Sequence, residues 1–455
     1  MTARNAAIAA VRDALNRRAY VRDTLRAAQS ARRIDVRSAA TATQLALGAL
    51  RRAITIDTIL SAVARYQANR VPVALRAVLY AASYELIWMD TPIHAAVDQA
   101  VGGATRIAGR GGGAMVNALL RALSGQILER AAPWLPLDPR RVRRGFADAC
   151  LFRRDVLPTA SGDPPLAHLA AATSERPARF RVLVERFGAC AAEQVAWASL
   201  ATPILVLRRN VRRAAREVFV DRISAEFPGA EICDDAAFAH PGGWTGDSSL
   251  IREGLAFVQD QTAHEAARLL AALPGERVLD LCAAPGGKTA VIAGAMDGRG
   301  EIVACDVSPP RLARLEENVS RLGLSCATLR LAPVGCLQAD LGVFDAAIVD
   351  VPCSNSGVLA RRPEARLRLR PQTIAELAQM QFELLHRAAR VVRTGGRLVY
   401  TTCSIEPEEN GQVVERFLST NSDWRLDQSR LTLPAWGPSP TDWRDGGFAA
   451  LLRHG

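Results

Sequence analysis

The stretch of residues 277–290, RVLDLCAAPGGKTA, constrains the fold more than any other part of the sequence. Its short apolar run predicts a buried strand, the Pro-Gly-Gly sequence predicts a tight turn, and the following TAVIAGAM predicts a helix. Gly286 and Gly287 would let backbone N–H groups approach a ligand closely, and a helix start favours a polar or anionic group. The stretch therefore predicts a ligand site between a strand and a helix.

Lys288, within this stretch, is the one lysine among the chain's 57 lysine and arginine residues. Two interpretations stay open at this point. One lysine could have survived by chance in a chain that uses arginine elsewhere. Alternatively, the site needs a compact ammonium, which a planar guanidinium cannot replace.

Length and composition indicate a globular chain with two or three domains, because 455 residues exceed one ordinary core. Without an apolar run of membrane-spanning length or a signal-peptide pattern, we expect a cytoplasmic protein with no membrane partner. The nine cysteines include no CxxC pair, and the six histidines are dispersed. We therefore expect neither a metal site nor a disulfide framework.

The positive charge is concentrated near the N-terminus. Residues 1–135 hold 18 arginines against eight acidic residues, which is nearly all of the chain's net charge of +11. A basic module favours a polyanionic partner, most simply RNA or DNA. The alternative is a solvated arginine-rich surface.

The chain divides into three predicted parts. Residues 1–135 have helical periodicity, with a break at 109–113, and predict an all-helical domain. We interpret Tyr84 and Trp88, at helical spacing, as core residues rather than as a base-stacking platform. Residues 136–255 predict a linker plus a small α+β domain, and the Pro- and Arg-rich residues 131–165 indicate a loosely packed connection. Residues 256–455 predict a separate α/β domain.

In this last part, strand and helix patterns alternate, which predicts a parallel sheet with helices on both faces. Ligands in such sheets bind outside the carboxyl ends of the strands. The expected strands are 277–282, 301–306, 327–332, 344–350 and 396–402, and the expected helices are 262–272, 288–296, 310–322, 373–392 and 408–419.

The residues that end these strands form a candidate site. Asp306 could bind the hydroxyls of a ribose, although many such acids only cap a helix. With the glycine turn one βα unit earlier, it predicts an adenosine-containing cofactor, while the turn matches neither the NAD nor the ATP fingerprint. Asp350, Cys353 and Cys403 end two further strands, where a thiol can serve as a nucleophile. We interpret the remaining cysteines as small buried hydrophobes: Cys150, Cys190, Cys233, Cys305, Cys326 and Cys336.

The segments DLCAAPGGKT, DVPCSNSG and TTCS, in this order, resemble the RsmB/Sun-type RNA cytosine-5 methyltransferases, which use S-adenosylmethionine. TPIHAAVDQAV and VNALLRAL resemble the NusB-like RNA-binding module of the RsmB subgroup. The resemblance implies a multidomain fold with an all-α NusB-like N-terminal domain, a small α+β linker domain and a C-terminal α/β Rossmann-like methyltransferase domain. It also implies small-subunit ribosomal RNA as the partner, and we expect a monomer.

The resemblance assigns roles by position. It implies that Cys403 is the nucleophile, that Cys353 assists product release, and that Asp350 lies beside the cofactor and the target base. It implies that Asp306 binds the ribose of S-adenosylmethionine. The remaining cofactor-binding positions would be Cys282, Ala283, Ala284, Pro285, Gly286, Gly287 and Lys288.

Three functions stay under consideration. The first is transfer of a methyl group to carbon 5 of a cytosine in RNA, because a thiolate added to carbon 6 would make carbon 5 nucleophilic. The second is a NusB-like RNA-binding factor whose methyltransferase domain no longer catalyses. The third is a small-molecule methyltransferase, which the basic N-terminal part and the paired cysteines disfavour.

Two segments depart from the family pattern. After the third strand, residues 330–335 read RLAPVG, where relatives carry an acid near the adenine, and Asp340 is out of register. After the Pro-Cys loop, Arg362-Pro363-Glu364 and Leu367 replace the usual His-Pro-Asp and Trp. We expect these departures to change the affinity for the cofactor and the fit of the target base, and not the roles of the two cysteines.

We predict that the missing acid weakens cofactor binding, because no carboxylate would accept hydrogen bonds from the adenosine. Pro333→Asp should therefore bind S-adenosylmethionine more tightly than the natural chain in a calorimetric titration. An unchanged dissociation constant would count against this explanation.

Overall fold

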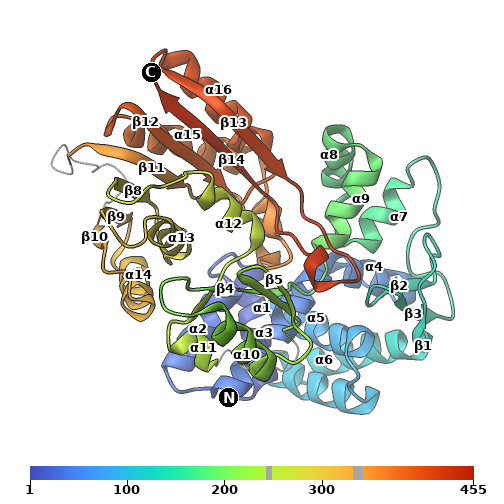
Figure 1. Ribbon diagram of the computed structural model, residues 1–455. Helices are drawn as coiled ribbons and strands as arrows, with labels where there is room; N and C mark the ends of the chain where they lie inside the picture. The colour runs from blue at the N-terminus through green and yellow to red at the C-terminus, as the bar shows by residue number, and fades with distance from the viewer. Residues whose placement is uncertain (242–247, 332–341) are drawn as a thin grey trace.

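The computed structural model describes residues 1–241, 248–331 and 342–455 (Figure 1). The N-terminal part is helical as far as Gln126, so the expectation of an all-helical domain over residues 1–135 is wrong at its end, where residues 127–133 form a strand. Side chains of Thr2 and Asp35 cap two of its helices by accepting hydrogen bonds from backbone N–H groups. Its helices are α1 (Ala3–Leu15), α2 (Val21–Ser30), α3 (Val36–Arg51), α4 (Ala53–Val63), α5 (Val73–Trp88) and α6 (Ile93–Gln126).

The expected break at 109–113 is a kink inside α6. Ala108 and Gly109 leave helical geometry, and Gly109 has a φ of +67°, which glycine adopts without strain. The helix continues after the kink to Gln126. The expected break is therefore present at Ala108 and Gly109, and it separates two helical segments within α6.

The loosely packed connection that we predicted over residues 131–165 is wrong. This region contributes to an antiparallel sheet of β1 (Ile127–Pro133), β3 (Asp148–Phe152) and β2 (Arg141–Arg143). Its arginines donate hydrogen bonds to backbone carbonyls, from Arg140 to Phe152 and from Arg141 to Pro133, so they are not a solvated charge run. Phe152 is fully buried against the N-terminal helices.

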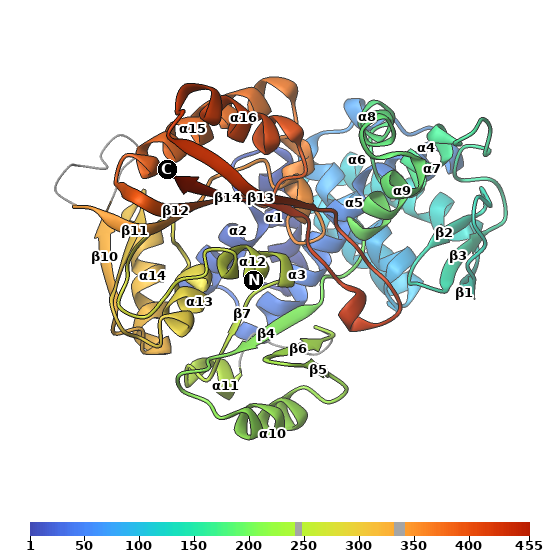
Figure 2. The ribbon, with the colours of Figure 1, turned by 45° about the horizontal axis from the view of Figure 1, so that its top comes forward.

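The region that follows is the α+β unit that we expected. Three helices, α7 (Leu166–Ala172), α8 (Pro177–Phe187) and α9 (Ala189–Ala198), precede a four-stranded sheet of order β5-β6-β4-β7. Figure 2 shows this sheet below the other two parts. Its elements are β4 (Leu205–Arg209), α10 (Arg216–Glu226), β5 (Glu231–Cys233), β6 (Ala236–Ala239), α11 (Ser249–Arg252) and β7 (Ala256–Val258).

The C-terminal part is built on a seven-stranded sheet of order β10-β9-β8-β11-β12-β14-β13. The expected parallel strands are present as β8 (Arg277–Leu281), β9 (Glu301–Asp306), β10 (Ala327–Leu331), β11 (Phe344–Asp350) and β12 (Val392–Thr402). The expectation of a wholly parallel sheet is wrong, because β13 (Trp424–Thr432) and β14 (Gly447–His454) pair antiparallel at one edge.

Helices cover both faces of this sheet, as the alternating pattern predicted (Figure 1). Alternate residues of one strand face different cores: Leu279 packs with α15 and α16, whereas Val278 packs with α12 and α13. The observed helices lie within a few residues of the expected ones. They are α12 (Gln261–Arg268), α13 (Gly287–Ala295), α14 (Pro309–Leu322), α15 (Pro371–Ala389) and α16 (Gly411–Thr420).

The three parts share contacts across their expected limits. Leu200, for example, lies in the same core as the N-terminal helices. The division into 1–135, 136–255 and 256–455 therefore remains our proposal. Across residues 1–241, 248–331 and 342–455, no helix combines the length and apolar character needed to cross a membrane.

The antiparallel edge offers a matched pair for a stability test, because Leu452 on β14 lies opposite Leu426 on β13. Leu452 is fully buried and Leu426 is 43% exposed. We predict that Leu452→Ala lowers the free energy of unfolding by about 2–5 kcal/mol, because it leaves a cavity in the core. Leu426→Ala should change it by less than about 0.5 kcal/mol. Urea denaturation followed by tryptophan fluorescence checks both, and equal losses would contradict this packing.

Candidate active site

Parallel pairing of β11 with β12 brings the two candidate cysteines together. Asp350, at the end of β11, lies opposite Thr401 on β12, and each cysteine follows its strand closely. As a result, the Sγ atoms of Cys353 and Cys403 lie 3.0 Å apart, and both residues are half-buried. Strand register therefore places two thiols at the carboxyl edge of the sheet, where the sequence predicted them.

Asn355 holds the two cysteines from the loop between them. Its side-chain Nδ2 donates to the Cys353 carbonyl at 2.9 Å, and its Oδ1 lies 3.4 Å from the Cys403 Sγ. Asn355 has a φ of +60°, a conformation that asparagine tolerates better than most residues. The sequence analysis did not assign it a role.

The two thiols lie close enough to influence each other's protonation. The hydrogen bond with Cys403 and burial both raise the pKa of the Cys353 thiol well above its ordinary value. At neutral pH, Cys353 is therefore a neutral thiol that can donate a hydrogen bond to the Cys403 sulfur.

Lys288 forms an ion pair with Asp350, with 2.7 Å between its Nζ and Oδ2 of the carboxylate. The Lys288 side chain is only 12% exposed and the Asp350 side chain 37%. Burial opposes the charge on Lys288, but Asp350 outweighs this effect, and the pKa of Lys288 is raised. The single lysine thus makes a specific buried contact, which favours the second interpretation of its presence.

The glycine turn lies between β8 and α13, as predicted. Cys282 opens it with a φ of +65°, and Gly286 has a φ of +100° immediately before the helix. A Cβ on Gly286 would lie 2.8 Å from Leu315 Cδ1, so both space and backbone require glycine. Burial raises the pKa of the Cys282 thiol, so this cysteine stays neutral.

Asp306 is buried at the end of β9 and faces the same turn. Its carboxylate accepts hydrogen bonds from the Ala284 N–H at 3.0 Å and from the Arg311 Nε at 2.6 Å. It also accepts one from the Val307 N–H at 2.7 Å. The side chain therefore joins the first two βα units at the turn, and the structure brings together both parts of the predicted cofactor site.

Asp280 is a candidate residue to which the sequence analysis gave no role. It is fully buried, Thr289 donates a hydrogen bond to its Oδ2 at 2.6 Å, and its Oδ1 has no partner. Burial raises its pKa to about 7. An orphaned carboxylate oxygen beside a turn that only glycine can form fits a polar cofactor bound at the carboxyl edge of the sheet.

A buried carboxylate connects the two cysteine loops. Glu409 is fully buried and accepts hydrogen bonds from the Ser354 N–H at 2.8 Å and from the Gln381 Nε2 at 2.9 Å. The hydroxyls of Ser354 and Ser404 both donate to its other oxygen. These serines directly follow Cys353 and Cys403, so one carboxylate positions both loops. Glu409 is not evident from the sequence because Ser354 and Gln381, two of its three partners, lie far from it along the chain.

Residues 362–367, which depart from the family pattern after the Pro-Cys loop, contact the N-terminal half of the chain. Glu364 accepts a hydrogen bond from the Val21 N–H at 3.1 Å, and Arg366 pairs with Glu175 at 3.3 Å. Beside Cys403, Glu406 pairs with Arg179 and with Arg186. Contacts between residues far apart in the sequence thus join these segments to the N-terminal half.

Other expectations have separate outcomes. The segment 332–335 and Asp340, which bear on the missing acid, lie outside the described residues, as does Cys336. Cys150, Cys305 and Cys326 are buried as expected, but Cys190 and Cys233 are exposed, so their interpretation as buried hydrophobes is wrong. Both side chains contact solvent rather than a hydrophobic core. In the described part of the chain, no group of three or more His, Cys, Asp or Glu side chains is arranged for a metal ion.

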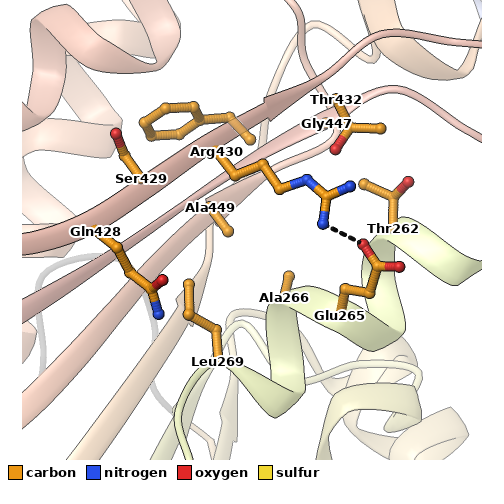
Figure 3. A pocket seen from close by; sticks show the side chains of 11 residues that line it. Thr262, Glu265, Ala266, Leu269, Gln428, Ser429, Arg430, Thr432, Gly447 and Ala449 are labelled. Atoms are coloured by element: carbon orange, nitrogen blue, oxygen red, sulfur yellow. Dashed lines mark hydrogen bonds and ion pairs between the residues drawn. The ribbon is translucent and has the colours of Figure 1, made fainter.

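A cavity of about 150 Å³ lies between α12 and the strands β13 and β14 (Figure 3). Arg430 reaches across it to Glu265, with a 3.0 Å contact. Its lining contains no cysteine and none of the turn residues 282–288. The candidate active site is therefore a different region of the domain.

The sheet, the glycine turn and the strand-end acids define a cofactor-binding α/β domain of the Rossmann-like class. Residues 267–436 match the family model described as 16S rRNA methyltransferase RsmB/F, and residues 1–124 match the NusB family. The ribosomal RNA small subunit methyltransferase B of Pseudomonas syringae is 31% identical over 77% of this chain and 72% of its own length. The chain belongs to the RsmB/F family.

Two further comparisons show how much of the chain resembles known proteins in sequence and in fold. The ribosomal RNA small subunit methyltransferase B of Proteus mirabilis is 40% identical over 44% of this chain, and the match spans about half of that relative, 47% of its length. The crystal structure of PH0851 covers 98% of both chains with a TM-score of 0.74 at 23% identity. This last likeness shows that the overall fold is shared.

We predict that Glu409→Gln slows methyl transfer by about 10- to 100-fold, because misplaced catalytic groups lose that much rate. The new amide would present a donor where the serine hydroxyls now find an acceptor. The dissociation constant of the cofactor should stay unchanged in a calorimetric titration. Glu408→Gln is the matched control, because its side chain is 37% exposed and does not contact the serines. Equal rates for the two variants would exclude a positioning role.

Asp280 makes stability depend on pH. Its pKa of about 7 in the folded chain exceeds the ordinary 3.8, so the folded state keeps a proton that the unfolded state loses. The stability should therefore fall as pH rises from about 4 to 7, by at most about 1.4 kcal/mol per pH unit. In thermal melts without cofactor, Asp280→Asn should lack this part of the pH dependence. Asp297→Asn, at an exposed position, is the control, and an unaltered slope in Asp280→Asn would refute the assignment.

Proposed function

We propose that this protein transfers a methyl group from S-adenosylmethionine to carbon 5 of a cytosine in small-subunit ribosomal RNA. The 3.0 Å approach of the Cys353 and Cys403 sulfur atoms carries the proposal. Carbon 5 of cytosine is a poor nucleophile until a thiolate adds to carbon 6. A nucleophilic thiol next to a second, neutral thiol therefore suits this reaction.

In the proposed mechanism, the Cys403 thiolate forms a bond to carbon 6 of cytosine and makes carbon 5 carbanion-like. S-adenosylmethionine, when bound, supplies the methyl group. The proton on carbon 5 then passes to water while the bond to the Cys403 sulfur breaks. Cys353, held as a neutral thiol, can donate a hydrogen bond to this sulfur and stabilise it as the leaving thiolate.

Asp350 and its partner Lys288 define the position of the base. The carboxylate is a hydrogen-bond acceptor and is 37% exposed, so it can accept a hydrogen bond from the exocyclic amino group of cytosine. Uracil carries an oxygen acceptor there, so two acceptors would face each other, which costs binding energy. The contact with Lys288 fixes the carboxylate in the required orientation.

The residues around the glycine turn fit the cofactor. Asp306 is the proposed acceptor for the ribose hydroxyls, and the turn from Cys282 to Lys288 would hold the methionine end. The unpartnered Oδ1 of Asp280 offers a further acceptor beside that turn. Arg311 already donates hydrogen bonds to the Asp306 carboxylate. Because the Arg311 side chain is 46% exposed, we expect it to move aside when the ribose binds.

Positive charge at the junction of the two halves supports an RNA partner. Arg17 lies near Arg370, Arg176 and Arg368. Burial lowers the pKa of Arg17 most, and the positive charges of these three arginines lower it further. Such a cluster suits phosphate groups. The alternative, an RNA-binding factor without catalysis, receives no support from an intact thiol pair and an intact Lys288–Asp350 contact. A small-molecule substrate would not contact this arginine cluster and so would not explain it.

We predict that the Cys353→Ala variant accumulates a covalent adduct with unmethylated small-subunit RNA in the presence of S-adenosylmethionine. Without the second thiol, the sulfur of Cys403 should leave too slowly for release. A denaturing gel should show a slowly migrating protein–RNA band. The double variant Cys353→Ala/Cys403→Ala is the control and should give no band. RNA retention without any adduct in the single variant would favour the non-catalytic alternative.

A further inference from the structure

A cavity of about 350 Å³ lies outside the active site, where distant parts of the chain meet. One wall comes from α3 and α5, a second from the loop between β2 and β3, a third from residues 200–204, and a fourth from the segment between β13 and β14. Figure 1 shows this last segment leaving the sheet and reaching toward the N-terminal helices. The volume is within the range of small-molecule sites and is large enough for one nucleotide.

Aromatic rings line the cavity on two sides. Tyr84 and Trp88 stack with 5.7 Å between their ring centroids, and Phe146 meets Trp436 edge to face at 5.4 Å. Phe146 is 46% exposed, which is unusual for a ring of this size. Gly48 makes room for this wall, because a Cβ there would lie 2.2 Å from the Tyr84 ring. The Arg143 guanidinium lies over one face of Phe146 and of Trp436, at 5.2 and 4.7 Å from the ring centroids. A flat base would therefore stack on the ring surface that Phe146 and Trp436 leave uncovered.

Arginines supply the polar groups of the same cavity. Arg52 is 7% exposed, lies 5.1 Å from the Trp88 ring centroid, and its Nε has no hydrogen-bond partner. The Nε of Arg144 also has none, although its Nη2 contacts the exposed Asp90 at 3.1 Å. The described residues that line the cavity include Arg51, Arg52 and Arg144 and no carboxylate. Unsatisfied buried donors of this kind indicate a missing acceptor.

The charge of this region favours an anion. Burial lowers the pKa of Arg52 to about 9, and although Tyr84 opposes the shift, the neighbouring Arg51 and Arg143 lower it further. A negatively charged group in the cavity would relieve this repulsion. An occupant therefore needs both a flat apolar face and an anionic group, which is the chemistry of a nucleotide.

The cavity is connected to the active site by a short series of contacts. Arg51, in its wall, donates a hydrogen bond to the Ala360 carbonyl at 2.6 Å. Ala360 lies in the loop that follows Cys353, and in that loop the Gly357 N–H donates to the Cys403 carbonyl at 3.0 Å. These buried contacts join a wall of the cavity to the loop that carries Cys353.

We propose that this cavity binds one unpaired nucleotide of the RNA substrate, with its base against Phe146 and Trp436. Tyr84 and Trp88 pack against the N-terminal core, as the sequence predicted, and close the opposite wall. The phosphate would contact Arg144 and Arg52. This inference rests on the proposed function for its RNA partner, but it assigns a second site, separate from the cysteines. The site would hold the strand while the target cytosine occupies the active site.

The test is the affinity of the full chain for a fluorescein-labelled single-stranded RNA of about ten nucleotides, measured by fluorescence anisotropy. Phe146→Leu and Trp436→Leu keep apolar volume but remove the stacking face, and each should weaken binding by about fivefold or more. Phe146→Tyr and Trp436→Phe keep a ring and should restore it. Leu128→Ala, at another exposed hydrophobic residue, is the matched control. Arg144→Gln should reduce the dependence of binding on salt by about one phosphate contact.

Three outcomes would overturn the proposal. Unchanged RNA affinity in both leucine variants would remove the site while leaving the methylation proposal intact, since the Cys403 adduct would still form. Displacement of the RNA by free cytidine monophosphate at equal concentration would identify a free-nucleotide site instead. No RNA binding by the natural chain, together with no adduct, would remove both proposals. Because the two leucine variants lie on separate segments, one that fails to fold leaves the other as the test.

Discussion

The pairing of β11 with β12 is the constraint on which the candidate site depends. Two parallel strands end at the same edge of a sheet, so Asp350 and the residues after Thr401 must be neighbours whatever their separation in the sequence. That geometry brings the Cys353 and Cys403 sulfur atoms to 3.0 Å. Pairing of β11 with β8 on its other side brings the glycine turn and Lys288 to the same edge. The order of the strands thus determines which side chains meet at the candidate site.

Strand pairing alone leaves the loops after the strands free to move, and buried polar contacts remove that freedom. Glu409 ties the residues after both cysteines to one carboxylate, and Asn355 contacts the cysteines themselves. Charged contacts from Glu364, Arg366 and Glu406 then join this region to the N-terminal half. Buried hydrogen bonds of this kind are costly when incomplete, so they favour one arrangement of the site over others.

Local patterns in the sequence predicted the strands β8 to β12, the glycine turn and the strand-end residues, because periodicity and turn chemistry act over a few residues. They did not predict β13 and β14, whose pairing is antiparallel and lies at the end of the sheet. The arginine-rich sequence of β2 suggested a loosely packed connection, although Arg141 donates a hydrogen bond to a backbone carbonyl of β1. Glu409 and Asp280 were missed for the same reason: burial and partners depend on the folded chain, and no short spacing reveals them.

The most direct test of the central claim, methylation at carbon 5 through Cys403, uses RNA that carries tritium on carbon 5 of its cytosines. Methylation at that atom must replace the tritium, so one tritium should be released to water for each methyl group transferred from S-adenosylmethionine. Release should disappear in Cys403→Ala. Methyl transfer without tritium release would contradict the account, because it would place the methyl group on another atom.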